Sequence, residues 1–226
     1  HACIKSAVDL ATEAETTVGP RYRALADGQY ALSEGRHSES AGLANDADPS
    51  WTPEEVSVWW KLLSDSEREA LINKDPEKYG NLDGIDMASR AKANELVLLG
   101  PKDASGQHVP GAGLLGQAER DLAEAEAAMV GATSNLAALD LKRKQAQNRV
   151  DDLRALRDQM NVDGVTLVSL QPGKPGENVL AALAIGDVDN AEHVATMVPG
   201  MTTNCRDSAA LNLGYAYNLR DAAVRA

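Results

Sequence analysis

The spacing of apolar residues predicts a mostly helical chain that ends in a short strand-forming region. In residues 1–34, apolar side chains recur every three or four positions, which predicts a helix that Gly19-Pro20 interrupts. Residues 33–50 are rich in Ser, Gly, Asn and Asp, a composition typical of a loop. The chain therefore opens on an interrupted helix followed by a loop.

Three helix starts follow within about 25 residues. Thr52-Pro53-Glu54-Glu55 and Ser64-Asp65-Ser66-Glu67 are capping-box sequences, in which a hydroxyl and a Glu carboxylate each satisfy a free backbone N–H. Asp75-Pro76 begins a third short helix, and residues 87–99 are expected to form a longer one. The chain here folds as short helices, ending in a loop or linker over 100–113.

A heptad pattern then runs over residues 115–160. Of its fourteen core positions twelve are apolar, which predicts a coiled-coil-like helix or hairpin. Residues 131–135, Gly-Ala-Thr-Ser-Asn, suit a turn, whereas the unbroken register favours one long helix, so both forms stay open. The segment could lie against other helices of the chain or pair with a second copy or another protein. Arg143 and Arg157 at core positions argue against a stable homodimer.

The period then changes from helix to strand. We expect strands at 165–170, 179–185 and 193–198, separated by turns, and a helix over 207–226. The fold class is thus mostly α with a small C-terminal β portion. Three segments are expected: a helical region (1–113), the coiled-coil-like segment (114–160) and a strand-bearing region (161–226).

Composition narrows the classes of partner. The net charge of −12, with basic residues interleaved among acids, argues against nucleic acid, and no apolar run is long enough to span a membrane. The absence of Phe leaves Ala and Leu to form helical cores. Cys3 and Cys205 form no CxxC pair; they are expected to be free thiols, with a disulfide in an oxidising compartment as the alternative. The start at His1, without Met, is typical of a processed or trimmed end.

Three stretches together resemble a family of uncharacterised actinobacterial α/β-hydrolases. The family's features are seen in Trp59-Trp60-x-x-Leu63 with the residues 67–72, in Gly80-Asn81-Leu82-Asp83-Gly84-Ile85 with Arg90 and Asn94, and in residues 189–203, which contain Val198-Pro199-Gly200-Met201. The resemblance implies a helical region that leads into the first strands of a hydrolase domain.

The resemblance also implies where chemistry would lie. The loop at Gly200, Met201 and Thr202 would supply part of an oxyanion hole, helped by the start of the following helix. The chain contains no Gly-x-Ser-x-Gly sequence, so the nucleophile and its partners would lie beyond Ala226 and no catalytic residue is expected within it. Some relatives resemble helical substrates of specialised secretion systems, which favours a secreted or cell-envelope location over the cytoplasm.

The remaining polar residues are expected to be structural. His193 comes too early in the chain for a hydrolase base, and His37 and His108 lie in loops without an acidic partner at ligand spacing. Asp187, Asp189 and Asn190 lack the full calcium-loop pattern and are interpreted as a turn. No metal and no cofactor are therefore predicted.

Trp59 and Trp60 are candidates for an interaction surface. Adjacent residues on a helix point in different directions, so one Trp could fill the core while the other contacts the hydrolase domain or a protein partner. Core packing of both is the alternative.

Two functional hypotheses follow. In the first, the chain is the N-terminal part of a serine hydrolase, incomplete by itself, whose partner is the remainder of the hydrolase domain. In the second, it is a non-enzymatic helical interaction module linked to export or the cell envelope.

Overall fold

The structure is a computed structural model that describes residues 46–174, 176–200 and 203–225. The helix expected over 1–34 lies outside the described residues. The chain divides into two compact units, His1–Ala70 and Leu71–Ala226, and each is described by itself.

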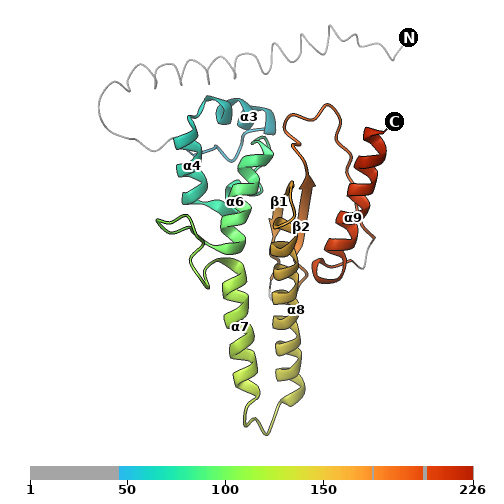
Figure 1. Ribbon diagram of the computed structural model, residues 1–226. Helices are drawn as coiled ribbons and strands as arrows, with labels where there is room; N and C mark the ends of the chain where they lie inside the picture. Colours follow the sequence, from blue (N-terminus) through green and yellow to red (C-terminus); the bar gives the residue numbers. More distant parts are fainter. Residues whose placement is uncertain (1–45, 175, 201–202, 226) are drawn as a thin grey trace, which may run out of the picture. The chain divides into compact units, whose positions relative to one another are not determined.

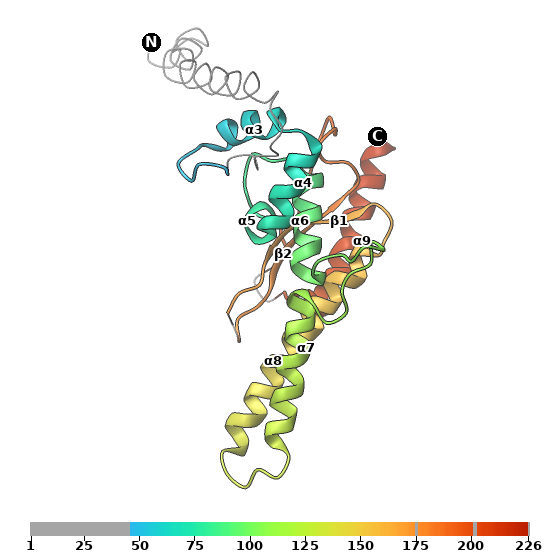
Figure 2. The same cartoon turned by 90° about the vertical axis from the view of Figure 1, so that its left-hand side faces the viewer.

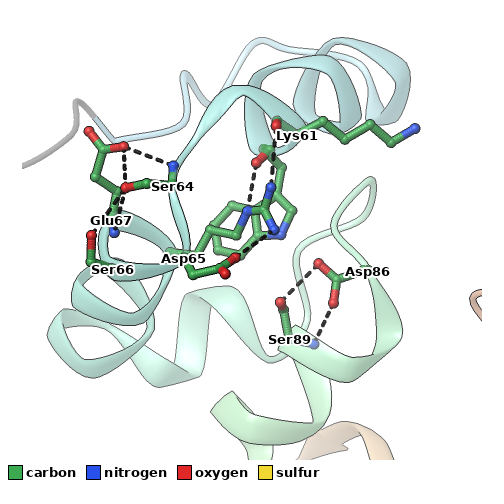
Figure 3. Close-up of polar contacts among 9 residues, drawn as sticks. Lys61, Ser64, Asp65, Ser66, Glu67, Asp86 and Ser89 are labelled. Carbon is green, nitrogen blue, oxygen red and sulfur yellow. Dashed lines mark hydrogen bonds and ion pairs between the residues drawn. The ribbon is translucent and has the colours of Figure 1, made fainter.

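In the described part of the first unit, two helices each begin at a capping box. Helix α3 (Pro53–Leu62) begins where the Glu55 amide donates to Thr52 Oγ1 (3.3 Å) and the Thr52 amide donates to Glu55 Oε2 (2.8 Å). Ser64 and Glu67 repeat the arrangement at the start of α4 (Asp65–Lys74), which Figure 3 shows. Both boxes were predicted from the sequence and both are confirmed.

The second unit opens with two helices that also begin at acidic caps. Asp75 caps α5 (Pro76–Tyr79), and Asp86 caps α6 (Met87–Leu99) by accepting hydrogen bonds from the Ser89 amide (2.7 Å) and hydroxyl (2.9 Å), also drawn in Figure 3. α6 ends at Gly100, whose positive φ of 88° turns the chain into the loop ahead of α7.

Residues 113–160 form a helical hairpin, which is one of the two forms that the heptad pattern left open. α7 (Gly113–Met129) and α8 (Leu136–Met160) lie side by side in Figures 1 and 2. Gly131 and Asn135 take positive φ values of 75° and 57°, which a right-handed helix cannot accommodate. The heptad pattern did not distinguish the two forms because each arm of a hairpin keeps its own apolar stripe.

The sheet holds two antiparallel strands in the described residues. β1 (Val165–Gln171) pairs with β2 (Leu180–Ile185), with a register shift between Leu167 and Ser169. The third predicted strand, 193–198, is wrong, since these residues have no regular secondary structure. Val194 is 61% exposed and Val198 83%, so the segment has no buried surface or partner strand to hold it extended in a sheet.

One core joins segments that the sequence had suggested as separate. Its buried residues come from α6, α7, α8 and β1, together with Val179, which directly precedes β2. The C-terminal helix α9 (Cys205–Val224) packs on α8 and β2. The predicted fold class, mostly helical with a small β portion near the C-terminus, is confirmed. No helix within the described ranges has the length and apolar character needed to cross a membrane.

Candidate functional site

The loop before α9 contains the residues that the sequence singled out for an oxyanion hole. Gly200 is exposed, and its carbonyl accepts hydrogen bonds from the Thr203 amide (3.2 Å) and hydroxyl (2.7 Å). Met201 and Thr202 lie outside the described residues. The geometry therefore does not decide whether this loop binds an oxyanion, and the assignment stays a prediction.

The start of α9 is closed by Asp152, a residue that sequence reasoning missed. Asp152 comes from α8 and is 2% exposed. Its Oδ1 accepts from the Arg206 amide (2.9 Å) and its Oδ2 from Arg206 Nη1 (3.0 Å), while the Asp207 amide donates to Asn204 Oδ1 (2.8 Å). Asp152 of α8 thus caps α9, because its carboxylate accepts a hydrogen bond from a backbone amide in the first turn of that helix. These two amides are occupied, so they are not open to a ligand in this structure.

A small polar hollow lies beside this contact. It is about 40 Å³ in volume and is lined by Gln145, Asn148, Arg149, Asp152, Gly176, Glu177, Asn178 and Arg206. Arg149 is already engaged, because its Nη1 donates to the Pro172 carbonyl at 2.7 Å. A hollow of this size holds about one water molecule, whereas small-molecule sites need roughly 300 Å³ or more. It is therefore no substrate pocket.

Cys205, the first residue of α9, is a free thiol without nucleophilic character. Burial, reinforced by the charge of Asp152, raises its pKa to about 11, so the thiol is neutral at physiological pH. Its sulfur contacts the Val179 carbonyl at 3.4 Å. Cys3, the other cysteine, lies outside the described residues.

The motif at residues 80–85 ties helices to the sheet. Asn81 Nδ2 donates to the Leu170 carbonyl (2.9 Å), and Asn81 Oδ1 accepts from the Ser169 hydroxyl (2.8 Å), both on β1. A Cβ on Gly80 would collide with the side-chain oxygen of Asn94, whose Nδ2 donates to the Gly80 carbonyl at 2.8 Å. Glycine is thus required here by close packing against α6.

A second motif meets the same helix. The carboxylate of Asp189 accepts hydrogen bonds from the Met87 amide (2.8 Å) and the Ala88 amide (3.0 Å) at the start of α6. Two stretches that are about 100 residues apart in the sequence are therefore joined at one helix start. Their geometry indicates a structural role, although the sequence predicted only a polar turn for Asp189.

His108 corrects one expectation, because it does have an acidic partner. Its Nε2 lies 2.9 Å from Glu95 Oε1 and its Nδ1 lies 2.6 Å from the Gly100 carbonyl. Lys102 adds an ion pair to the same Glu95 oxygen (3.0 Å). The sequence hid this cluster because Glu95 is 13 residues away, on α6. It fastens the loop between α6 and α7 to the end of α6.

The other polar candidates do not gather into a site. His193 is exposed, His1 and His37 lie outside the described residues, and Asp187 accepts hydrogen bonds from the Asn190 amide (3.2 Å) and side chain (2.7 Å) as a polar turn. Within the part of the chain that the structure describes, no three His, Cys, Asp or Glu residues are placed to hold a metal ion.

Trp59 and Trp60 are both buried. Each is 2% exposed, and Trp59 contacts Trp51 and Trp60 with ring centroids 5.8 and 5.5 Å apart. The guanidinium of Arg68 lies 6.0 Å from the Trp60 ring. Both indoles are therefore buried in this structure, which corresponds to the alternative of core packing and not to an exposed interaction surface.

Comparison with known proteins agrees with the motifs. A family model described as an alpha/beta hydrolase matches residues 174–226. The chain is 30% identical over 161 residues to the uncharacterized protein Rv2079 of Mycobacterium tuberculosis, an alignment that covers 67% of this chain and 22% of that protein. It is 40% identical over 62 residues to the uncharacterized protein Mb0988c of Mycobacterium bovis, covering 27% of this chain and 23% of that protein. No solved structure matches the chain significantly.

Proposed function

From the relationship of this chain to an actinobacterial α/β-hydrolase-like family of unknown function, we propose that it is the N-terminal part of a serine hydrolase acting on an ester or related acyl substrate. The observation that carries the proposal is the match of residues 174–226 to the hydrolase family model. Two of the relatives align with 67% of this chain, but this alignment covers only 22% of their own length. The chain therefore spans about a fifth of these relatives.

The division of labour in the proposal follows from what the chain contains. It has no Gly-x-Ser-x-Gly sequence, so the nucleophile, its base and its acid are assigned to sequence beyond this chain. The backbone amides of Gly200, Met201 and Thr202 are assigned to the developing oxyanion. The helices supply the frame, because Asp152 of α8 holds the start of α9 next to that loop.

The test compares this chain with the product of the complete gene. Both are treated with a fluorophosphonate probe and assayed with a short-chain p-nitrophenyl ester. We expect labelling and turnover only in the longer protein, at a serine in a Gly-x-Ser-x-Gly sequence. Ester turnover by this chain alone, or a complete gene product without such a serine, contradicts the proposal. Substituting the labelled serine by Ala is the matched control.

A helical interaction module is the second candidate, and the hairpin favours it. No residue between 119 and 148 is fully buried, and Val130 next to the turn is 84% exposed. The test is to measure the molar mass of the wild-type chain and of the Val130→Lys variant in solution by light scattering. In this alternative the wild-type chain forms a dimer that the substitution dissociates, whereas a monomeric wild type argues against pairing through the hairpin.

A further inference from the structure

Helix α9 carries large apolar side chains on two different faces. Leu213 faces inward and is 7% exposed, as expected for a helix that packs on α8 and β2. Leu211, Tyr215 and Leu219 follow one another at intervals of four residues and are 57%, 54% and 51% exposed. Residues four apart lie on the same side of a helix, so these three form one outward stripe. We call it the outer face of α9.

Gly214 lies in the same turn of α9 as Leu211 and Tyr215, beside the outer face rather than on it. A Cβ placed there would meet no atom within 4 Å, so no neighbour excludes a side chain. Glycine in the middle of a helix is less stable than alanine, and its usual benefit is the close approach of another backbone. That benefit is available only if another segment packs on α9 at Gly214, along the flank of the outer face.

The neighbouring sheet is also incomplete on its own. β2, which α9 contacts, pairs with β1 alone among the described residues, and its Leu180 is 59% exposed. A two-stranded sheet leaves backbone groups unpaired at its edges, and stable sheets usually add strands or cover those edges.

Resting on the proposed function, we infer that the outer face of α9 is the surface on which the remaining part of the same hydrolase domain packs. Two observations favour this occupant. The match to the hydrolase model includes all of α9, and the relatives extend well beyond the matched share of 22% of their length. A helix with apolar residues on opposite sides is typical of the interior of a larger domain.

The test uses opposite effects in two proteins. In this chain alone, Leu211→Glu changes the melting temperature by less than about 2 °C because the side chain is already half exposed. Gly214→Leu leaves it unchanged or higher, since leucine is the better helix former. In the complete gene product both substitutions lower the melting temperature by more than about 4 °C or make the protein insoluble.

The matched control is Leu141→Glu on α8, where the leucine is also 57% exposed. It leaves both proteins unchanged if the effect belongs to α9. Three outcomes overturn the inference: a complete gene that ends at Ala226, a loss of stability from Leu211→Glu in this chain alone, or a dimer of this chain that Leu211→Glu dissociates. Melting temperature does not depend on turnover, so a longer protein that lacks esterase activity but loses stability would refute the proposed function and keep this inference.

Discussion

At the scale of single residues, buried or clustered charged side chains form the contacts that join distant helices and loops. Asp152 is the clearest case, because a carboxylate 3% exposed at its side chain faces the guanidinium of Arg206. In the heptad pattern this position lies outside the a and d series, so the pattern gives no sign that it is buried. It is buried because α9 packs there, and that contact is not visible in the local sequence.

Removing this carboxylate should be costly. We expect Asp152→Ala to lower the free energy of unfolding by about 3 kcal/mol, because it leaves a partly buried guanidinium and a helix start without their acceptor. Urea unfolding followed by circular dichroism measures it. Asp158→Ala, on the same helix but in an exposed pair with Arg157, should cost less than about 0.5 kcal/mol. Equal effects of the two variants would show that burial of Asp152 contributes nothing.

The Glu95 cluster predicts a pH dependence. Burial raises the pKa of Glu95, but the hydrogen bonds from His108 and Lys102 outweigh it and hold the pKa below the ordinary value of 4.5. An acid with a depressed pKa contributes stability above its unfolded pKa and loses that contribution as pH falls through the folded one. Glu95→Gln should therefore be less stable than wild type at pH 7, and the difference should shrink below about pH 4.5. Unfolding curves from pH 7 to pH 3 test this, and a constant difference would contradict it.

At the scale of elements, local signals predicted the helix starts but left the choice between a hairpin and one long helix open. The capping sequences at Thr52 and Ser64 act within four residues, so the sequence alone was sufficient to predict them. In the turn between α7 and α8, Asn135 has a φ of 57°. Asparagine adopts this conformation more readily than most residues, but an asparagine in a sequence does not by itself predict it.

Substitutions at Asn135 test the origin of the turn. Asn135→Gly should keep or raise the melting temperature, because glycine takes positive φ without strain. Asn135→Val should destabilise the hairpin by about 1–2 kcal/mol, because a β-branched residue is strained there. Thermal unfolding measures both, and equal stability of the two variants would indicate that the turn tolerates a different backbone conformation.

The region of residues 165–198 shows that the local sequence of a segment is not sufficient to predict a strand. The β-branched and apolar runs predicted three strands, and two of them pair as β1 and β2. Residues 193–198 carry similar side chains but remain exposed without regular structure, since a strand also needs a neighbour for its backbone.

At the scale of the whole molecule, one core crosses the three segments expected from the sequence. Val150, Leu153 and Leu156 of α8 lie in the same buried cluster as Leu98 of α6 and Leu167 of β1. Residues that share a core tend to unfold together.

Hydrogen exchange should reveal that organisation. We expect amides of residues 150–156 and 165–170 to be protected to a similar degree, and those of 123–146 to exchange faster because that part of the hairpin holds no fully buried residue. Mass spectrometry of peptides from a native-state time course measures this. Uniform protection along both arms of the hairpin would mean that its tip is stabilised by contacts outside the described core.

The sequence by itself determined the helical character, the capped helix starts, two of the strands and the family resemblance. These follow from interactions within a few residues and from motifs that need no three-dimensional context. Only the tertiary structure decided that the heptad region folds back as a hairpin, that 193–198 is not a strand and that Asp152 caps α9. It also decided that Glu95 and His108 meet. Each of these depends on which distant segment lies opposite, because burial, strand pairing and charge neutralisation are properties of pairs of elements rather than of one.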